Sequence, residues 1–257
     1  MKYLNDVSYK DCVGKVCKSK SSGDFKVLKY NNAKEVGVRF LKTGYETVAR
    51  LDNIKSGSVK DPYSPSVYGV GIIGAKYPVS EGSFKTKEYD LWCSMLRRCY
   101  SEKYQKKQPT YEGCEVSDNF KSFEYFYEWC HKQIGFNNKG WHLDKDLLTK
   151  GNKVYSENSC VFIPAEINTL LIKCTASRGE NLIGVYWDKK GKAFVAMVNK
   201  NKGGSEYLGY FKTEIEAFNA YKKAKEAFIK EQAEKWKGKI DDRAYEALMD
   251  YQVEITD

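Results

Sequence analysis

The chain has 257 residues, of which 42% are apolar, and this composition excludes a low-complexity or disordered protein. The formal charge of +9 is consistent with a polyanionic partner, although a lysine-rich solvated surface gives the same sum. No apolar run approaches the ~18 residues that span a bilayer. The N-terminus, MKYLNDVSYKDC, lacks the apolar core of a secretory signal. We therefore expect a soluble, cytoplasmic protein with more than one domain.

Residues 1–75 are typical of a small β-rich module. Runs at 24–30, 35–40 and 45–50 alternate partly between apolar and polar residues, and SSG, NNA and KTG mark turns between them. Short strands with tight turns predict a small β-barrel-like module or a curled sheet. We interpret it as a docking or DNA-positioning module, because it has no cluster of catalytic side chains.

Residues 76–174 begin with helices. Arg97 and Arg98 lie beside an apolar stripe at helical spacing and are candidate contacts to a DNA backbone, or to solvent alone. A second helical stripe is aromatic, and a core role is favoured over base stacking for it. The two stripes are Trp92, Met95, Leu96 and Cys99, then Phe120, Phe123 and Phe126.

The eight cysteines form no CxxC pair. Disulfides need an oxidising compartment, and zinc sites usually have closer ligand spacing. Buried thiols are the favoured interpretation. The less favoured one is a structural zinc site built from Cys99, Cys114, Cys130 or His131.

The segment 140–164, GWHLDKDLLTKGNKVYSENSCVFIP, contains the densest group of candidate catalytic residues. If HLDKDLL is a strand, then His142, Asp144 and Asp146 project to one face. Two carboxylates and an imidazole on one face predict a site for Mg²⁺ or Mn²⁺. TKGNK can turn the chain, CVFIP supplies a second strand, and a helix can begin after Pro164.

This order and the run LDKD…GNKVYSENSCVFIP, preceded by LWCSMLRRCY, resemble the ββα-metal motif of HNH endonucleases of the phage homing type. The resemblance places Asp144 as a metal ligand and Asn158 as the asparagine that orders the loop. It places Asn168, or Glu166, at the helix position that completes the metal site.

The general-base histidine of that motif is replaced here by Lys145, whose ammonium group is normally charged and cannot accept a proton. In an active enzyme, His142 would activate water and Lys145 would pair with the scissile phosphate. Two alternatives remain open. The segment is a catalytically degenerate nuclease fold, or an ion-paired hairpin in which Asp144 and Asp146 accept from turn amides and from Lys150 or Lys153.

Residues 175–240 predict a compact α+β unit. Strands at 182–187, 193–199 and 205–211 are joined by DKKGK and KNKGG, and Thr213 with Glu216 forms a capping box for the following helix. That helix carries an apolar stripe. We expect it to cover one face of the sheet and to leave the other face to solvent or a ligand. The stripe consists of Phe218, Tyr221, Ala224 and Phe228.

GVYW, KGKAF, YLGYF-T and EAFNAYKKAK resemble the DNA-binding domain of plant ethylene-response-factor (APETALA-type) proteins, in which the sheet enters the major groove. The resemblance puts Tyr186, Asn199 and Tyr207 on the DNA side. The turn lysines are natural phosphate contacts. Several arginines of the plant face are missing, which removes the bidentate contact to guanine. The turn lysines are Lys189, Lys192, Lys200 and Lys202.

Residues 241–257 carry six acids and one arginine and read as an acidic tail, a candidate contact for a protein partner.

The whole sequence predicts a multidomain α+β protein of a phage or mobile element that binds double-stranded DNA. A metal-dependent HNH-like endonuclease is the first interpretation. The alternatives are a degenerate regulator or architectural protein, and a protein-interaction or inhibitor module. If the protein is phage-encoded, its compartment would be the cytoplasm of the infected cell.

Overall fold

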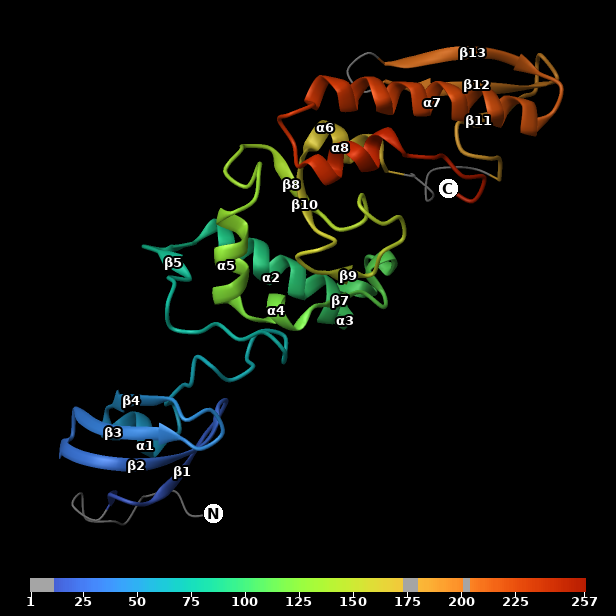
Figure 1. The fold of residues 1–257 in the computed structure, drawn as a ribbon. Coiled ribbons are helices and arrows are strands. Elements are labelled where there is room, and N and C mark those ends of the chain that lie inside the picture. The colour runs from blue at the N-terminus through green and yellow to red at the C-terminus, as the bar shows by residue number, and fades with distance from the viewer. Residues whose placement is uncertain (1–11, 173–179, 201–203) are drawn as a thin grey trace. The chain divides into compact units, whose positions relative to one another are not determined.

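The computed structural model describes residues 12–172, 180–200 and 204–257 (Figure 1). The predicted phosphate contact Lys202 and the thiol of Cys174 lie outside these ranges. The chain divides into two compact units, Met1–Trp129 and Cys130–Asp257. Helices are mixed with several small sheets, as expected. Within the described ranges no helix is long and apolar enough to cross a membrane.

The first unit begins with a four-stranded antiparallel sheet in the order β1-β2-β3-β4. The predicted barrel is wrong, because this sheet is open, with the short strands β1 and β4 at its edges. Helix α1 covers the core face instead, and its Leu51 and Ile54 are buried with Phe25 and Phe40. The sequence patterns missed β1 and α1. The elements are β1 (Val16–Ser19), β2 (Gly23–Asn32), β3 (Glu35–Phe40), β4 (Glu46–Ala49) and α1 (Leu51–Ser56).

The helical part that follows has both predicted stripes in its core. Trp92, Met95, Leu96 and Cys99 of α2 are buried, and so are Phe120, Phe123 and Phe126. The indole nitrogen of Trp92 donates to the carbonyl of Phe120 at 2.7 Å. The aromatic stripe is divided between two short helices. The elements are β5 (Ser80–Glu81), β6 (Phe84–Lys85), α2 (Lys87–Tyr100), α3 (Glu102–Gln105), the 3-10 helix η2 (Pro109–Tyr111), β7 (Glu115–Val116), α4 (Asp118–Lys121) and α5 (Phe123–His131).

The second unit contains the predicted order of strand, loop, strand and helix. Strand β8 (Trp141–Asp144) pairs antiparallel with β10 (Val161–Pro164), so that Leu143 lies opposite Phe162. Helix α6 (Ala165–Leu170) follows β10 directly. The short strand β9 (Val154–Tyr155) lies in the connection between β8 and β10.

The three predicted C-terminal strands form one antiparallel sheet, β11 (Val185–Asp188), β12 (Ala193–Asn199) and β13 (Ser205–Phe211). Helix α7 (Glu214–Trp236) runs along it, as Figure 1 shows. The predicted capping box at Thr213 and Glu216 is present.

Helix α7 belongs to two hydrophobic cores, which the sequence did not predict. Its first half packs Phe218 and Tyr221 against the sheet. Its second half buries Ile229 and Ala233 with Ile167 and other residues of the β8–β10 hairpin and α6. One long helix therefore joins the C-terminal sheet to the β8–β10 hairpin.

Residues 241–257 fold onto the same unit. Helix α8 (Asp242–Met249) buries Ala244 and Leu248 in the core shared with the hairpin, and Val253 packs in the sheet core. The Lys150 ammonium donates to the carboxylate of Asp257, whose side chain is buried. The apolar residues of the predicted tail thus stabilise the unit, and a protein partner for its exposed acids stays a prediction.

Candidate functional site

Lys145 stands where the resemblance expects a general base, and its side chain is only 7% exposed. The ammonium donates to Asp146 Oδ1 at 2.5 Å and to the carbonyl of Asn152 at 2.7 Å. Tyr155 lies beneath it, with 5.7 Å between the ammonium and the ring centre. A buried cation needs such partners, because it has lost its hydration. The lysine is therefore engaged inside the hairpin.

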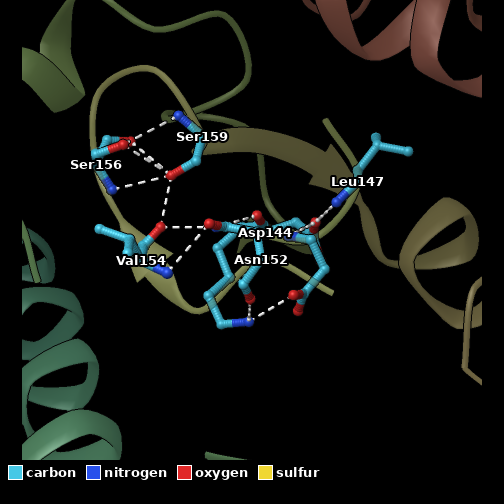
Figure 2. A network of polar contacts seen from close by, with 8 residues as sticks. Asp144, Leu147, Asn152, Val154, Ser156 and Ser159 are labelled. Atoms are coloured by element: carbon cyan, nitrogen blue, oxygen red, sulfur yellow. Dashed lines mark hydrogen bonds and ion pairs between the residues drawn. The ribbon is translucent and has the colours of Figure 1, made fainter. Parts of the chain in front are cut away.

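Asn152 organises the connection between the two strands. Its amide nitrogen donates to the carbonyls of Lys145 at 2.8 Å and Val154 at 2.7 Å, and its amide oxygen accepts from Val154 N at 3.2 Å (Figure 2). The hydroxyl of Ser159 also donates to the Val154 carbonyl, at 2.6 Å, and lies 2.9 Å from the Ser156 hydroxyl. These contacts fix the loop through side chains.

The resemblance implies that Asn158 orders the loop, and Asn158 is exposed. The backbone carbonyl of Asn158 is 3.5 Å from Arg243 Nη1. The described hydrogen bonds give the ordering role to Asn152 and Ser159. The Gly151-Asn152 pair carried the signal for Asn152, since asparagine in a turn often bonds to nearby backbone groups.

Asp144 ends strand β8 and closes the turn after it. Its Oδ1 accepts from the backbone nitrogens of Leu147 at 2.7 Å and Asp146 at 2.9 Å. Burial raises the pKa of the Asp144 carboxyl above its usual range, and the negative charge of Asp146 acts in the same direction. One oxygen of the Asp144 carboxylate thus accepts hydrogen bonds from turn amides, as expected for an ion-paired hairpin.

The strand ends at Asp144, so Asp146 does not continue the predicted row with His142. Asp146 lies in the turn and forms the ion pair with Lys145. In the described parts of the chain, no group of three or more histidine, cysteine or acidic residues is arranged to hold a metal ion. The predicted site for Mg²⁺ or Mn²⁺ stays a prediction.

His142 does meet one of its predicted partners. Its Nδ1 is 3.3 Å from the amide nitrogen of Asn168 on α6, at the exposed side of the hairpin. Glu166, the alternative at this position, accepts instead from the indole nitrogen of Trp236 at 2.7 Å and from Lys235 at 3.2 Å. Asn168, rather than Glu166, therefore lies beside His142.

The outer face of the C-terminal sheet carries three exposed tyrosines. Tyr186 and Tyr210 flank Val195 across the strands, and Tyr207 pairs with Met197. Tyr186 is 47% exposed, Tyr210 59% and Tyr207 52%, while Val195 between them is 1% exposed. Phe194, Ala196 and Val198 pack in the helix-facing core, as the alternation of side chains along a strand predicts. Tyr210 belongs to this face although it was not predicted as a DNA contact.

The basic residues around this face differ in their surroundings. Lys189 and Lys192 are exposed in the turn between β11 and β12. Asp188 holds that turn by accepting from the backbone nitrogens of Lys190 and Gly191, each at 3.1 Å. Asn199, at the end of β12, is also exposed. Lys200 differs from these residues, because it is half-buried and ion-paired with Glu206.

The two candidate arginines of the first unit stack on tyrosine rings. The Arg97 guanidinium lies 4.9 Å from the centre of the Tyr104 ring, and that of Arg98 lies 5.4 Å from the Tyr111 ring. Arg97 is exposed and Arg98 half-buried. Both remain candidate contacts to phosphate, with Arg97 the more accessible.

The cysteines considered for zinc, Cys99, Cys114 and Cys130, are buried free thiols, and His131 is exposed with its ring against Phe136. Burial also raises the pKa of the Cys160 thiol, to about 12. A thiol with that pKa is not ionised at neutral pH, so Cys160 is unreactive there.

No family model matches the chain, and no curated protein or solved structure is detectably similar to it.

Proposed function

We propose that this protein binds duplex DNA through the outer face of the β11–β13 sheet. The observation that carries the proposal is the row of exposed tyrosines on that face, next to the exposed lysines of the β11–β12 turn. Aromatic rings with an exposed face and hydroxyl can contact bases and sugars, and lysines neutralise phosphates. Helix α7 holds the sheet from behind, so the face is presented as a rigid surface.

We further propose that the β8–β10 hairpin is the catalytically degenerate form of an HNH-like motif and serves as a scaffold. The buried ammonium of Lys145 supports this, because its hydrogen bonds to Asp146 and to the Asn152 carbonyl stabilise the loop. The turn amides at Asp144 support it as well. The protein would then be a regulator or architectural protein of a phage or mobile element.

The experiment is a titration of labelled duplex DNA by fluorescence anisotropy at rising salt. A binder with about six phosphate contacts loses roughly a thousandfold in affinity between about 50 and 200 mM salt. Replacing Lys189 and Lys192 by alanine should weaken binding and flatten the salt dependence by about two phosphate contacts. The matched control is Lys223→Ala, an exposed lysine of α7. If the double variant and Lys223→Ala have equal salt slopes, then Lys189 and Lys192 do not contact phosphates.

A metal-dependent DNA endonuclease is the second candidate, favoured by the contact between His142 and Asn168 at 3.3 Å. These two side chains would then be a water-activating base and a group that completes a Mg²⁺ or Mn²⁺ site. Plasmid nicking in Mg²⁺ and in Mn²⁺ tests the endonuclease activity. The controls are EDTA and the variant His142→Ala, whose site is exposed. Cutting that is lost with EDTA and with the variant would establish an active site. Absence of cutting, with DNA binding that survives EDTA, would establish the scaffold.

A further inference from the structure

A cavity of about 700 Å³ lies within the second unit, beside the start of α6 and the second half of α7. Two tryptophans line it, Trp141 from β8 and Trp236 from the end of α7. Their ring centres are 5.6 Å apart and the rings are nearly perpendicular. This arrangement gives the cavity an aromatic wall made by segments that are far apart in the sequence.

The charged groups around the wall are mainly cationic. Lys139, Lys200 and Lys235 line the cavity, against the single carboxylate of Glu166. Glu166 is held by the Trp236 indole nitrogen at 2.7 Å and by Lys235 at 3.2 Å. Lys200 is also ion-paired with Glu206, so three ammonium groups meet two carboxylates. The remaining excess of positive charge favours an anionic occupant.

We propose that this cavity binds a nucleotide, with its base against the tryptophan wall and its phosphate among the lysines. Ligand sites usually enclose about 300–1,000 Å³ and combine apolar or aromatic walls with a few polar groups. Planar bases stack on aromatic side chains irrespective of base identity. The same chemistry is offered by a free nucleotide and by an unpaired nucleotide of a strand. The proposal does not depend on the tyrosines of the sheet.

The test is a titration of the full chain, followed by tryptophan fluorescence, with deoxyguanosine 5′-monophosphate and with a short single-stranded oligodeoxynucleotide. Deoxyguanosine and inorganic phosphate are titrated separately, and each should bind more weakly than the nucleotide. Saturable binding of both the nucleotide and the oligonucleotide supports a site for free nucleotides. Binding of the oligonucleotide alone supports an unpaired nucleotide of a strand.

Three variants separate the site from general charge effects. Lys235→Ala should weaken binding about tenfold, the usual effect of losing a hydrogen bond to a charged group. Glu166→Gln should tighten binding, because it removes the opposing charge and keeps an acceptor for Trp236. Lys230→Ala, an exposed lysine on the same helix, should leave binding unchanged. Circular dichroism checks that each variant is folded.

The opposite signs for Lys235→Ala and Glu166→Gln are the decisive result, since damage to the fold would weaken binding in both. Absence of saturable binding by either probe would overturn the proposal, as would equal binding by all variants. Duplex binding through the sheet is measured separately with Tyr207→Ala, which should not alter the cavity. A failure of the cavity with duplex binding intact therefore leaves the proposed function standing.

Discussion

Lys145 and Asn152 hold each other reciprocally across the hairpin loop. The Lys145 ammonium donates to the Asn152 carbonyl at 2.7 Å, and the Asn152 amide nitrogen donates to the Lys145 carbonyl at 2.8 Å. Each side chain thus satisfies a backbone oxygen of the other residue, and an unpaired buried ammonium would be costly. This pairing gives the lysine a structural reason to occupy the position.

Asn152→Ala should destabilise the protein by about 2 kcal/mol, because the Lys145 carbonyl and the Val154 nitrogen lose the Asn152 side chain as a partner. The Val154 carbonyl loses one of its two donors and keeps the Ser159 hydroxyl. Asn158→Ala, at the exposed loop position that the sequence favoured, should change stability by less than about 0.5 kcal/mol. Urea unfolding of both variants measures the difference. A larger loss for Asn158→Ala would return the ordering role to that residue.

Lys145→Met should cost about 1–3 kcal/mol of unfolding free energy, since the apolar side chain keeps the volume but leaves the Asn152 carbonyl without its donor. Duplex DNA affinity should stay the same, because the lysine is buried in the hairpin. Chemical denaturation and anisotropy measure the two quantities. A folded variant with weakened DNA binding would show that Lys145 reaches the ligand.

Asp144→Asn tests the raised pKa of the Asp144 carboxyl. A carboxyl whose folded pKa lies above its unfolded value of about 3.9 disfavours folding once the pH exceeds both pKa values. Its contribution to stability is therefore present below the unfolded pKa and is lost as the pH rises through the folded pKa. The amide variant should be at least as stable as the wild type at neutral pH, and this advantage should vanish below about pH 4.

Thermal melts of the wild type and Asp144→Asn across that pH range give the result. If Asp144→Asn is instead less stable than the wild type at neutral pH, the ionised carboxylate stabilises the turn. That result would contradict a pKa of Asp144 that burial raises.

Local patterns in the sequence predicted local structure well and long-range packing poorly. The alternation of β12, the capping box at Thr213 and the buried α2 stripe were readable because they depend on neighbouring residues. Strand β1 and helix α1 were missed, and the open sheet was mistaken for a barrel, because closure depends on which edges meet.

The same limit applies to the candidate site. The order of β8, β10 and α6 was predicted, but the partners of its polar side chains depend on where the strand ends. Asp146 was placed on the strand face with His142, whereas the chain turns after Asp144. The acidic composition of 241–257 suggested a tail because composition does not reveal that Leu248 is in a core.

Leu248→Ala should destabilise the protein by about 3 kcal/mol, since its fully buried side chain fills the core shared by α7, α8 and the hairpin. Ile255→Ala, half exposed in the same segment, should change stability by less than about 0.5 kcal/mol. Denaturant titration compares them. Equal, small effects would mean that residues 241–257 do not stabilise the unit.

The most direct test of the central claim is duplex DNA binding by the double variant Tyr186→Ala, Tyr207→Ala in EDTA. Loss of the two exposed rings should weaken binding about tenfold or more, and the wild type should bind in EDTA at least as tightly as in Mg²⁺, which competes for the phosphates. The control is Phe84→Ala, an exposed aromatic of the first unit that is 80% accessible. Wild-type affinity in the double variant, or affinity that needs the metal ion, would contradict DNA binding through the outer face of the sheet.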